Sequence, residues 1–115
     1  MSVKITELGC AGHLIMSSRC RWRRHTQIGD VYRVSTVGDY FPSDTREPIG
    51  WGDQFFESWV FATAAAYEPN NDGCGCRQVV DWTGLEIRRY ATAGEAQAGH
   101  EDLVAKYATL AEVEQ

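Results

Sequence analysis

Six cysteine and histidine side chains are the residues of this chain best suited to bind a metal ion: Cys10, His13, Cys20, His25, Cys74 and Cys76. Structural zinc prefers thiolate and imidazole ligands in tetrahedral sets of four. Two glycine-containing turns, one at Cys10-x-x-His13 and one at Cys74-Gly75-Cys76, could each supply two of them. A Cys-x-Cys spacing is less typical of zinc sites than a two-residue gap, and small buried cysteines are common and inert. We therefore expect buried thiols and no cofactor, with zinc held by Cys10, His13, Cys20, Cys74 and Cys76 as the alternative.

A second cluster with chemical potential is the basic segment from Arg19 to His25, which carries four arginines and a tryptophan. On a strand, alternate side chains share a face. Arg19, Arg21 and Arg23 then line one face, and Cys20, Trp22 and Arg24 the other. An arginine row beside an aromatic ring suits a phosphate backbone, with binding that weakens as salt rises. The alternative is a solvated face that pairs with acidic residues of the same chain, which the net charge of −5 favours.

Catalysis receives less support from the sequence. Each cysteine could form a catalytic dyad with His13, His25 or His100. However, the chain has no G-x-S-x-G, P-loop or H-E-x-x-H motif. His100 lies on the apolar face of the expected last helix, and its acidic neighbours Glu101 and Asp102 point elsewhere on that helix. A lone histidine at such a position is more often a hydrogen-bonded core residue than a catalyst, and the sequence leaves open whether His100 faces the core or a cleft. An enzyme is less expected than a binding protein.

Aromatic residues follow in the segment from Tyr40 to Phe56, which includes Trp51 and Phe55. Tryptophan, tyrosine and arginine dominate protein-binding hot spots, so an exposed segment of this kind could bind a partner. The alternative is that these rings cover the open face of a sheet. The predicted binding residues, for protein or nucleic acid, are Arg19, Arg21, Trp22, Arg23, Arg24, Trp51 and Phe55.

The elements that position these residues are mainly strands. Loose alternation predicts strands over 3–8, 14–16, 55–65, 76–82 and 85–91, and a hairpin of strands 19–28 and 31–37 joined at Gly29-Asp30. On the strand over 55–65, Trp59, Phe61 and Thr63 share one face. Residues 38–54 predict a long loop.

The last element is predicted to be a helix. Thr92 and Glu95 form an S/T-x-x-E capping box, and apolar residues then recur at helical spacing, at Ala96, His100, Leu103, Val104, Tyr107 and Leu110. Gly94 and Gly99 weaken this helix by up to about 1 kcal/mol each relative to alanine, so it must gain stability by packing on the sheet. The fold class is α+β: an antiparallel sheet of four to six strands and one C-terminal helix.

The 115 residues predict a single domain, residues 1–115. No run approaches the ~20 apolar residues that span a bilayer, and the N-terminus lacks a signal-peptide pattern, so we expect a cytoplasmic protein with no membrane partner. Residues 1–34 carry six basic and two acidic residues, and residues 35–115 carry five basic and fourteen acidic ones. This asymmetry suits a charged partner.

Five segments resemble a family of small bacteriophage and prophage proteins to which no activity is assigned. They are Ala11-Gly12-His13, Cys20 to Thr26, Val34 to Gly38, Phe56 to Phe61, and Tyr90 to Ala96 with Ala98-Gly99-His100. The resemblance implies an origin in a phage or mobile element and a setting in the cytoplasm of a bacterial host. Small acidic proteins of this class often bind and block a host protein, including components of host defence.

Three functions follow as expectations. The first is a non-enzymatic protein that binds a host or phage protein. The alternatives are a zinc-stabilised nucleic-acid-binding module that uses the arginine-rich strand, and a Cys/His-dependent enzyme. A homo-oligomer is compatible with each of them.

Overall fold

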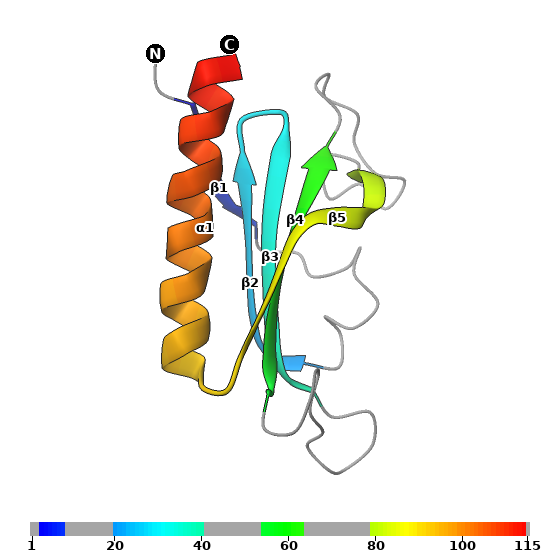
Figure 1. Cartoon of the computed structure of the whole chain (residues 1–115), viewed down its shortest axis with the longest axis vertical. Coiled ribbons are helices and arrows are strands. Elements are labelled where there is room, and N and C mark those ends of the chain that lie inside the picture. The colour runs from blue at the N-terminus through cyan, green and yellow to red at the C-terminus, as the bar shows by residue number, and fades with distance from the viewer. Residues whose placement is uncertain (1–2, 9–19, 41–53, 64–78, 115) are drawn as a thin grey trace.

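A computed structural model of the chain describes residues 3–8, 20–40, 54–63 and 79–114. These residues form five strands, β1 (Ile5–Leu8), β2 (Cys20–Ile28), β3 (Tyr32–Tyr40), β4 (Phe56–Thr63) and β5 (Val79–Tyr90), and then α1 (Ala93–Glu114). The strands make one antiparallel sheet in chain order, and α1 packs across one of its faces (Figure 1). This arrangement confirms the predicted α+β fold.

The hairpin of β2 and β3 lies at the centre of the sheet. Ile28 pairs with Tyr32 in register, so three residues, Gly29 to Val31, form the turn instead of the two that the sequence predicted. Gly29 takes a φ of 51°, and the N–H of Val31 donates to the carbonyl of Ile28 over 3.3 Å. The prediction of a loop from residue 38 onward was also wrong at its start, because β3 continues to Tyr40.

The strands predicted at 76–82 and 85–91 are one continuous strand, β5, with an irregularity inside it. Its pairing with β4 passes from Val60↔Glu86 to Ala62↔Asp81, so β5 has extra residues at this point. Gly84 lies in this bulge with a φ of 83°, and a Cβ atom there would come within 2.8 Å of the Trp59 ring. A glycine in the bulge therefore allows β5 to change register while staying paired with β4.

Helix α1 begins as the capping box predicted. The Thr92 hydroxyl accepts the N–H of Glu95 over 3.2 Å and donates to the Glu95 carboxylate over 3.1 Å. Ala96, His100, Leu103 and Tyr107 are buried as expected. The last predicted position was wrong: Leu110 is 39% exposed, and Ala111 is fully buried in its place.

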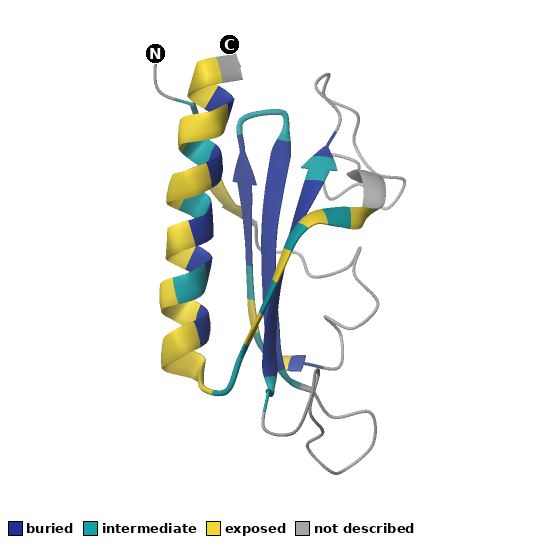
Figure 2. Ribbon diagram, in the orientation of Figure 1, coloured by how far each residue is buried: buried dark blue, intermediate teal, exposed yellow. Residues whose placement is uncertain are grey.

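The interface between α1 and the sheet has two halves of different chemistry. Around the C-terminal half of α1 the contacts are apolar, and the Tyr32 and Tyr107 rings meet edge to face with centroids 5.0 Å apart. The residues of this cluster are Ile28, Tyr32, Val34, Val60, Leu103, Tyr107 and Ala111. Around the N-terminal half, His100 meets hydroxyl groups from the strands. Figure 2 shows the buried stripe of α1 turned toward the sheet and its exposed residues turned outward.

The opposite face of the sheet is also buried along β2, β3 and β4, and polar side chains are prominent on it. They include His25, Gln27, Arg33, Ser35, Glu57 and Thr63. Trp59 and Phe61 share this face, as the sequence predicted, and their rings stack with centroids 5.7 Å apart. Within the described ranges, no helix is both long and apolar enough to cross a membrane.

Candidate functional site

Five of the seven predicted binding residues lie in the described part of the chain, and four of these gather at one end of the sheet. At this end β2 begins, β3 ends and β4 begins (Figure 1). Arg21, Trp22 and Arg23 come from the start of β2, and Phe55 immediately precedes β4. We call these four residues the sheet-end patch. Arg19 and Trp51 lie outside the described residues.

The strand geometry divides the sheet-end patch between two faces. Trp22 lies on the face that carries α1 and meets the Phe56 ring edge to face, with centroids 6.0 Å apart. Arg21 and Arg23 alternate with it and point to the opposite face, where both are exposed. At the same end of the sheet, a backbone hydrogen bond joins the end of β3 to the residue before β4: the N–H of Asp39 donates to the carbonyl of Phe55 over 3.1 Å. Asp39 has a φ of 54°, in the left-handed region that aspartate visits more readily than most residues.

Charges of both signs lie at the end of the sheet that carries the sheet-end patch. Arg23 acts on the buried thiol of Cys20 as a positive charge, and Glu57 and Asp39 act on it as negative charges. Glu57 is itself buried and accepts a hydrogen bond from Arg89 Nε over 3.0 Å. Burial raises the pKa of Glu57, and hydrogen bonds from Trp59 and Arg89 oppose the rise. Two carboxylates and one arginine therefore act on Cys20 at this end of the sheet.

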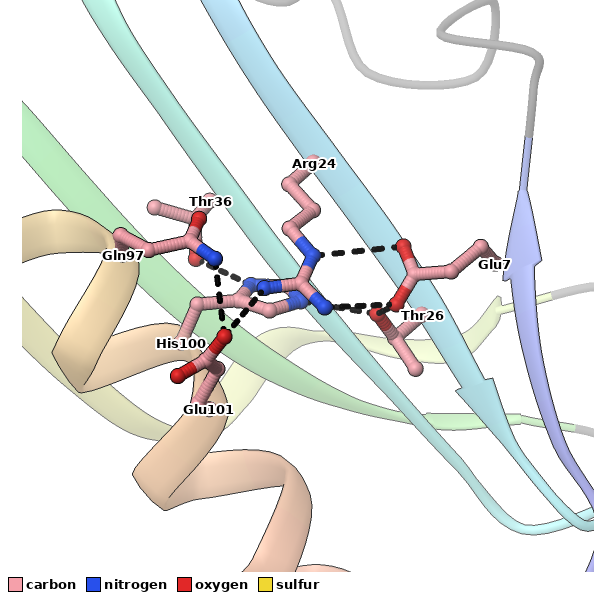
Figure 3. A network of polar contacts seen from close by, with 7 residues as sticks. All are labelled: Glu7, Arg24, Thr26, Thr36, Gln97, His100 and Glu101. Atoms are coloured by element: carbon pink, nitrogen blue, oxygen red, sulfur yellow. Dashed lines mark hydrogen bonds and ion pairs between the residues drawn. The ribbon is translucent and has the colours of Figure 1, made fainter. Parts of the chain in front are cut away.

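Arg24 lies apart from Arg21 and Arg23, on the face of the sheet that carries α1, and takes part in a polar network there. Its guanidinium contacts Glu7 of β1 over 3.1 Å and Glu101 of α1 over 3.5 Å (Figure 3). Gln97 donates to the same Glu101 carboxylate over 2.8 Å. Of the two interpretations of the arginine segment, intramolecular pairing with acidic residues therefore holds for Arg24.

His100 is the centre of this network. It is fully buried, with Nε2 2.8 Å from the Thr26 hydroxyl and Nδ1 2.7 Å from the Thr36 hydroxyl. The Thr36 hydroxyl also forms a hydrogen bond with the Ser58 hydroxyl over 2.6 Å, and the Tyr90 hydroxyl donates to Ser58 over 3.1 Å. At the other end Thr26 donates to Glu7 over 2.7 Å. One chain of hydrogen bonds therefore joins all five strands to α1.

The donor and acceptor of each hydrogen bond in this network follow from the carboxylate of Glu7 at one end of it. The carboxylate of Glu7 can only accept, so the Thr26 hydroxyl donates to it and accepts the proton on His100 Nε2. The bare Nδ1 of neutral His100 then accepts from Thr36, and Thr36 accepts from Ser58. Each hydroxyl thus donates once and accepts once, which satisfies both ring nitrogens.

Electrostatics keep His100 neutral and Glu7 charged. Burial, with the positive charge of Arg24, lowers the pKa of His100 to about 4. Burial alone would raise the pKa of Glu7, but hydrogen bonds from Arg24 and Thr26 outweigh it, and the pKa of Glu7 is lowered. Neutral His100 has no contact with solvent, so of the two placements that the sequence left open, the structure shows the hydrogen-bonded core residue.

The predicted metal ligands are mostly outside the described residues. Cys10, His13, Cys74 and Cys76 all lie there. Cys20 is a buried free thiol whose pKa rises to about 11, mainly through burial. In residues 3–8, 20–40, 54–63 and 79–114, no three His, Cys, Asp or Glu side chains gather as a metal site. A zinc site that uses the other cysteines stays a prediction.

Sequence reasoning missed most of the polar network. It singled out Arg24 and His100, but Glu7, Thr26, Thr36, Ser58 and Tyr90 carried no local signal. The partners of His100 on β2 and β3 are 74 and 64 residues away in the chain. One signal could have revealed the network. Three neighbouring strands each place a polar residue on the face that packs against α1, at Thr26, Thr36 and Ser58, and α1 places His100 on the face that packs against the sheet.

Comparison with known proteins identifies no relative: no protein-family model, no curated protein and no solved structure matches this chain.

Proposed function

We propose that this chain is a non-enzymatic binding protein that uses the sheet-end patch to bind another protein. The observation that supports the proposal is the register of β2, β3 and β4, which brings Arg21, Trp22, Arg23 and Phe55 to one end of the sheet. Arg21 and Arg23 are exposed there, and Trp22 is half-buried. Arginine and aromatic side chains around a rigid sheet end match the composition of protein-binding hot spots.

The charge around the patch favours a protein partner over nucleic acid. A surface that tracks a phosphate backbone gains affinity from uninterrupted positive charge. Here Cys20 experiences the positive charge of Arg23 together with the negative charges of Glu57 and Asp39, and Arg24 is held by Glu7 and Glu101 on the other face. A mixed surface of this kind suits a protein surface that presents both acidic and apolar groups.

The buried polar network supports a binding function rather than catalysis. Acid–base catalysis needs a proton acceptor within reach of a substrate. His100 is fully buried, and hydroxyl groups occupy both of its ring nitrogens. The network therefore holds α1 on the sheet and fixes the platform that carries the patch.

The proposed partner is a host or phage protein in the bacterial cytoplasm, such as a component of host defence. Support for this part comes from the resemblance to phage and prophage proteins. The sheet-end patch is the proposed binding surface, and the resemblance to phage proteins is the reason for proposing a bacterial or phage partner.

The proposal can be tested by capture from a bacterial lysate with matched variants. The bait is the whole chain, as wild type, as Arg21→Ala with Arg23→Ala, and as Lys4→Ala with Lys106→Ala. Both double variants remove two positive charges, but only the first touches the patch. Lys106→Ala also removes the 2.7 Å contact to Glu86 of β5, so circular dichroism confirms that both variants are folded. We expect wild type and the lysine variant to retain the same protein after nuclease treatment, and the arginine variant to lose it.

Two outcomes would contradict the proposal. Equal retention of the partner by the arginine variant would mean that the patch is not the binding surface. Loss of all retention after nuclease treatment, together with saturable oligonucleotide binding that weakens steeply with salt, would favour the nucleic-acid-binding alternative.

A further inference from the structure

A second surface, separate from the sheet-end patch, lies along β5. Among the described strands β5 is the last in the sheet, with β4 on one side of it. Leu85 and Ile87 are 50% and 42% exposed. They occupy alternate positions and therefore share the face opposite α1. Few large apolar side chains of the described residues are this exposed, and two of them lie on this one strand.

An edge strand with exposed apolar residues is a template for pairing with another strand, because half of its backbone N–H and C=O groups point away from the sheet. Charged side chains on the edge usually discourage such pairing. On β5 the charged residues Glu86 and Arg88 face α1. Glu86 accepts from Lys106 over 2.7 Å, and Arg88 contacts Asp102 over 2.9 Å. Arg88 also donates to Glu86 of the same strand over 2.9 Å, so α1 and this contact hold both charges on the face that carries α1. On the opposite face, the charged residue Arg89 contacts Glu57 of β4 over 3.0 Å.

The order of these residues is symmetric about Ile87. In antiparallel pairing of two identical strands, one residue lies on the twofold axis and faces its own copy. With Ile87 on the axis, Glu86 of each copy lies opposite Arg88 of the other. We propose that β5 pairs antiparallel with β5 of a second copy of this chain about a twofold axis at Ile87.

Charge selects this register over its neighbours. An axis at Glu86 places two glutamates directly opposite each other, and an axis at Arg88 does the same with two arginines. Like charges opposite each other destabilise a strand pair, whereas opposite charges stabilise it. The axis at Ile87 gives two Glu86–Arg88 pairs, brings Ile87 against Ile87, and places Leu85 of each copy opposite Arg89 of the other. Both copies of α1 then lie on the same face of one continuous sheet.

The dimer leaves the sheet-end patch accessible. The arginines of the patch belong to β2, and β3 and β4 separate β2 from β5. Neighbouring strands lie about 4.8 Å apart, so β2 and β5 are about 14 Å apart across the sheet. Dimerisation and the proposed partner binding therefore use different residues and can be tested separately.

Sedimentation equilibrium of the whole chain tests the dimer. A short strand pair is a small interface, so the average mass should rise from 12.9 kDa toward twice that value between about 1 µM and 1 mM. Ile87→Lys places two lysines on the axis and should weaken the dimer at least tenfold. The control is Val113→Lys on α1, where a 79% exposed valine receives the same new charge, and its dimer should match wild type. A wild-type chain that stays monomeric to 1 mM, or an Ile87→Lys variant that dimerises as wild type does, would overturn the proposal.

Charge complementation tests the register. Arg88→Glu places glutamates opposite each other, and Glu86→Lys places positive charges opposite each other, so each variant alone should dimerise at least tenfold more weakly. Mixed in equal amounts, they should form a heterodimer in which opposite charges face each other across the axis. Circular dichroism confirms that each variant is folded before it is measured. Two folded variants that fail to form the heterodimer, or that each dimerise as wild type does, would contradict the axis at Ile87.

Discussion

At the scale of single residues, His100 organises the interface between α1 and the sheet. Burying a polar ring is costly unless both nitrogens find partners. Thr26 and Thr36 supply these partners from two strands. The carboxylate of Glu7 can only accept, so it determines which group donates in each hydrogen bond of the network. A satisfied buried network of this kind fixes one position of α1 on the sheet.

Thr36→Val tests this network directly. The valine removes the donor to His100 Nδ1 and leaves a buried acceptor unsatisfied, so we expect a loss of about 1–3 kcal/mol in the free energy of unfolding. Thr109→Val is the matched control, because Thr109 is exposed on α1. Its effect should stay within about 0.5 kcal/mol. Urea denaturation measures both, and equal effects at the two positions would contradict the role given to Thr36.

The two buried histidines predict how stability depends on pH. The pKa values of His25 and His100 both fall from 6.5 to about 4 in the folded chain, chiefly through burial. Between these values the unfolded chain binds protons that the folded chain does not. Stability is therefore full above about pH 6.5 and falls toward pH 4, by roughly 1 kcal/mol per pH unit for each histidine.

Carboxylates modify this pH profile in a recognisable way. The raised pKa of Glu57 acts in the opposite direction and offsets part of the loss. The lowered pKa values of Glu7 and Glu86 remove stability only as the pH falls below about 4.5. In a His100→Gln variant, the histidine part of the slope between pH 6.5 and 5 should fall by about half. An unchanged slope in urea titrations would show that His100 does not titrate as the structure implies.

At the scale of elements, the sequence predicted those whose signals are local. Thr92 and Glu95 marked the start of α1 three residues apart, and the capping bonds form between them. The β-branched residues of β3 and the glycine at the turn predicted the central hairpin. In each case the residues that define the element are close in the chain, so propensity and spacing were enough.

Elements shaped by distant contacts were not predictable in the same way. The sequence predicted two strands, 76–82 and 85–91, but Trp59 of β4 packs against Gly84 between them and β5 stays paired on both sides. Leu110 was expected to be buried because it is apolar, yet Ala111 occupies the position that faces the sheet. The partners of Arg24 were equally hidden, because Glu7 and Glu101 come from opposite ends of the chain.

The two glycines of α1 should respond in opposite ways to alanine. A Cβ atom at Gly99 would overlap the Tyr90 ring, whereas a Cβ atom at Gly94 meets only the Thr92 hydroxyl at 4.0 Å. Gly94→Ala should therefore raise the free energy of unfolding by up to about 1 kcal/mol. Gly99→Ala should lower it, because Tyr90 must move away from Ser58. Thermal unfolding by circular dichroism compares the two, and stabilisation by Gly99→Ala would contradict the packing of Tyr90 on α1.

At the scale of the whole molecule, the charge asymmetry of the sequence is partly internal. Arg24, from the basic N-terminal third, contacts Glu101 of the acidic remainder. Arg21 and Arg23 stay exposed at the sheet end, where Glu57 and Asp39 act on the neighbouring Cys20 as negative charges. The chain therefore offers arginine and aromatic side chains on the two faces of one sheet end, and the exposed apolar side chains of Leu85 and Ile87 along β5.

The affinity of the captured partner for variants of the sheet-end patch tests the central claim most directly. With the partner purified, calorimetry gives the Kd of wild type, of Arg21→Ala with Arg23→Ala, and of Lys4→Ala with Lys106→Ala. Hot-spot residues contribute about 2 kcal/mol or more, so we predict that the arginine variant binds at least tenfold more weakly and that the lysine variant matches wild type. An arginine variant that binds within twofold of wild type while remaining folded would contradict the claim that this end of the sheet binds the partner.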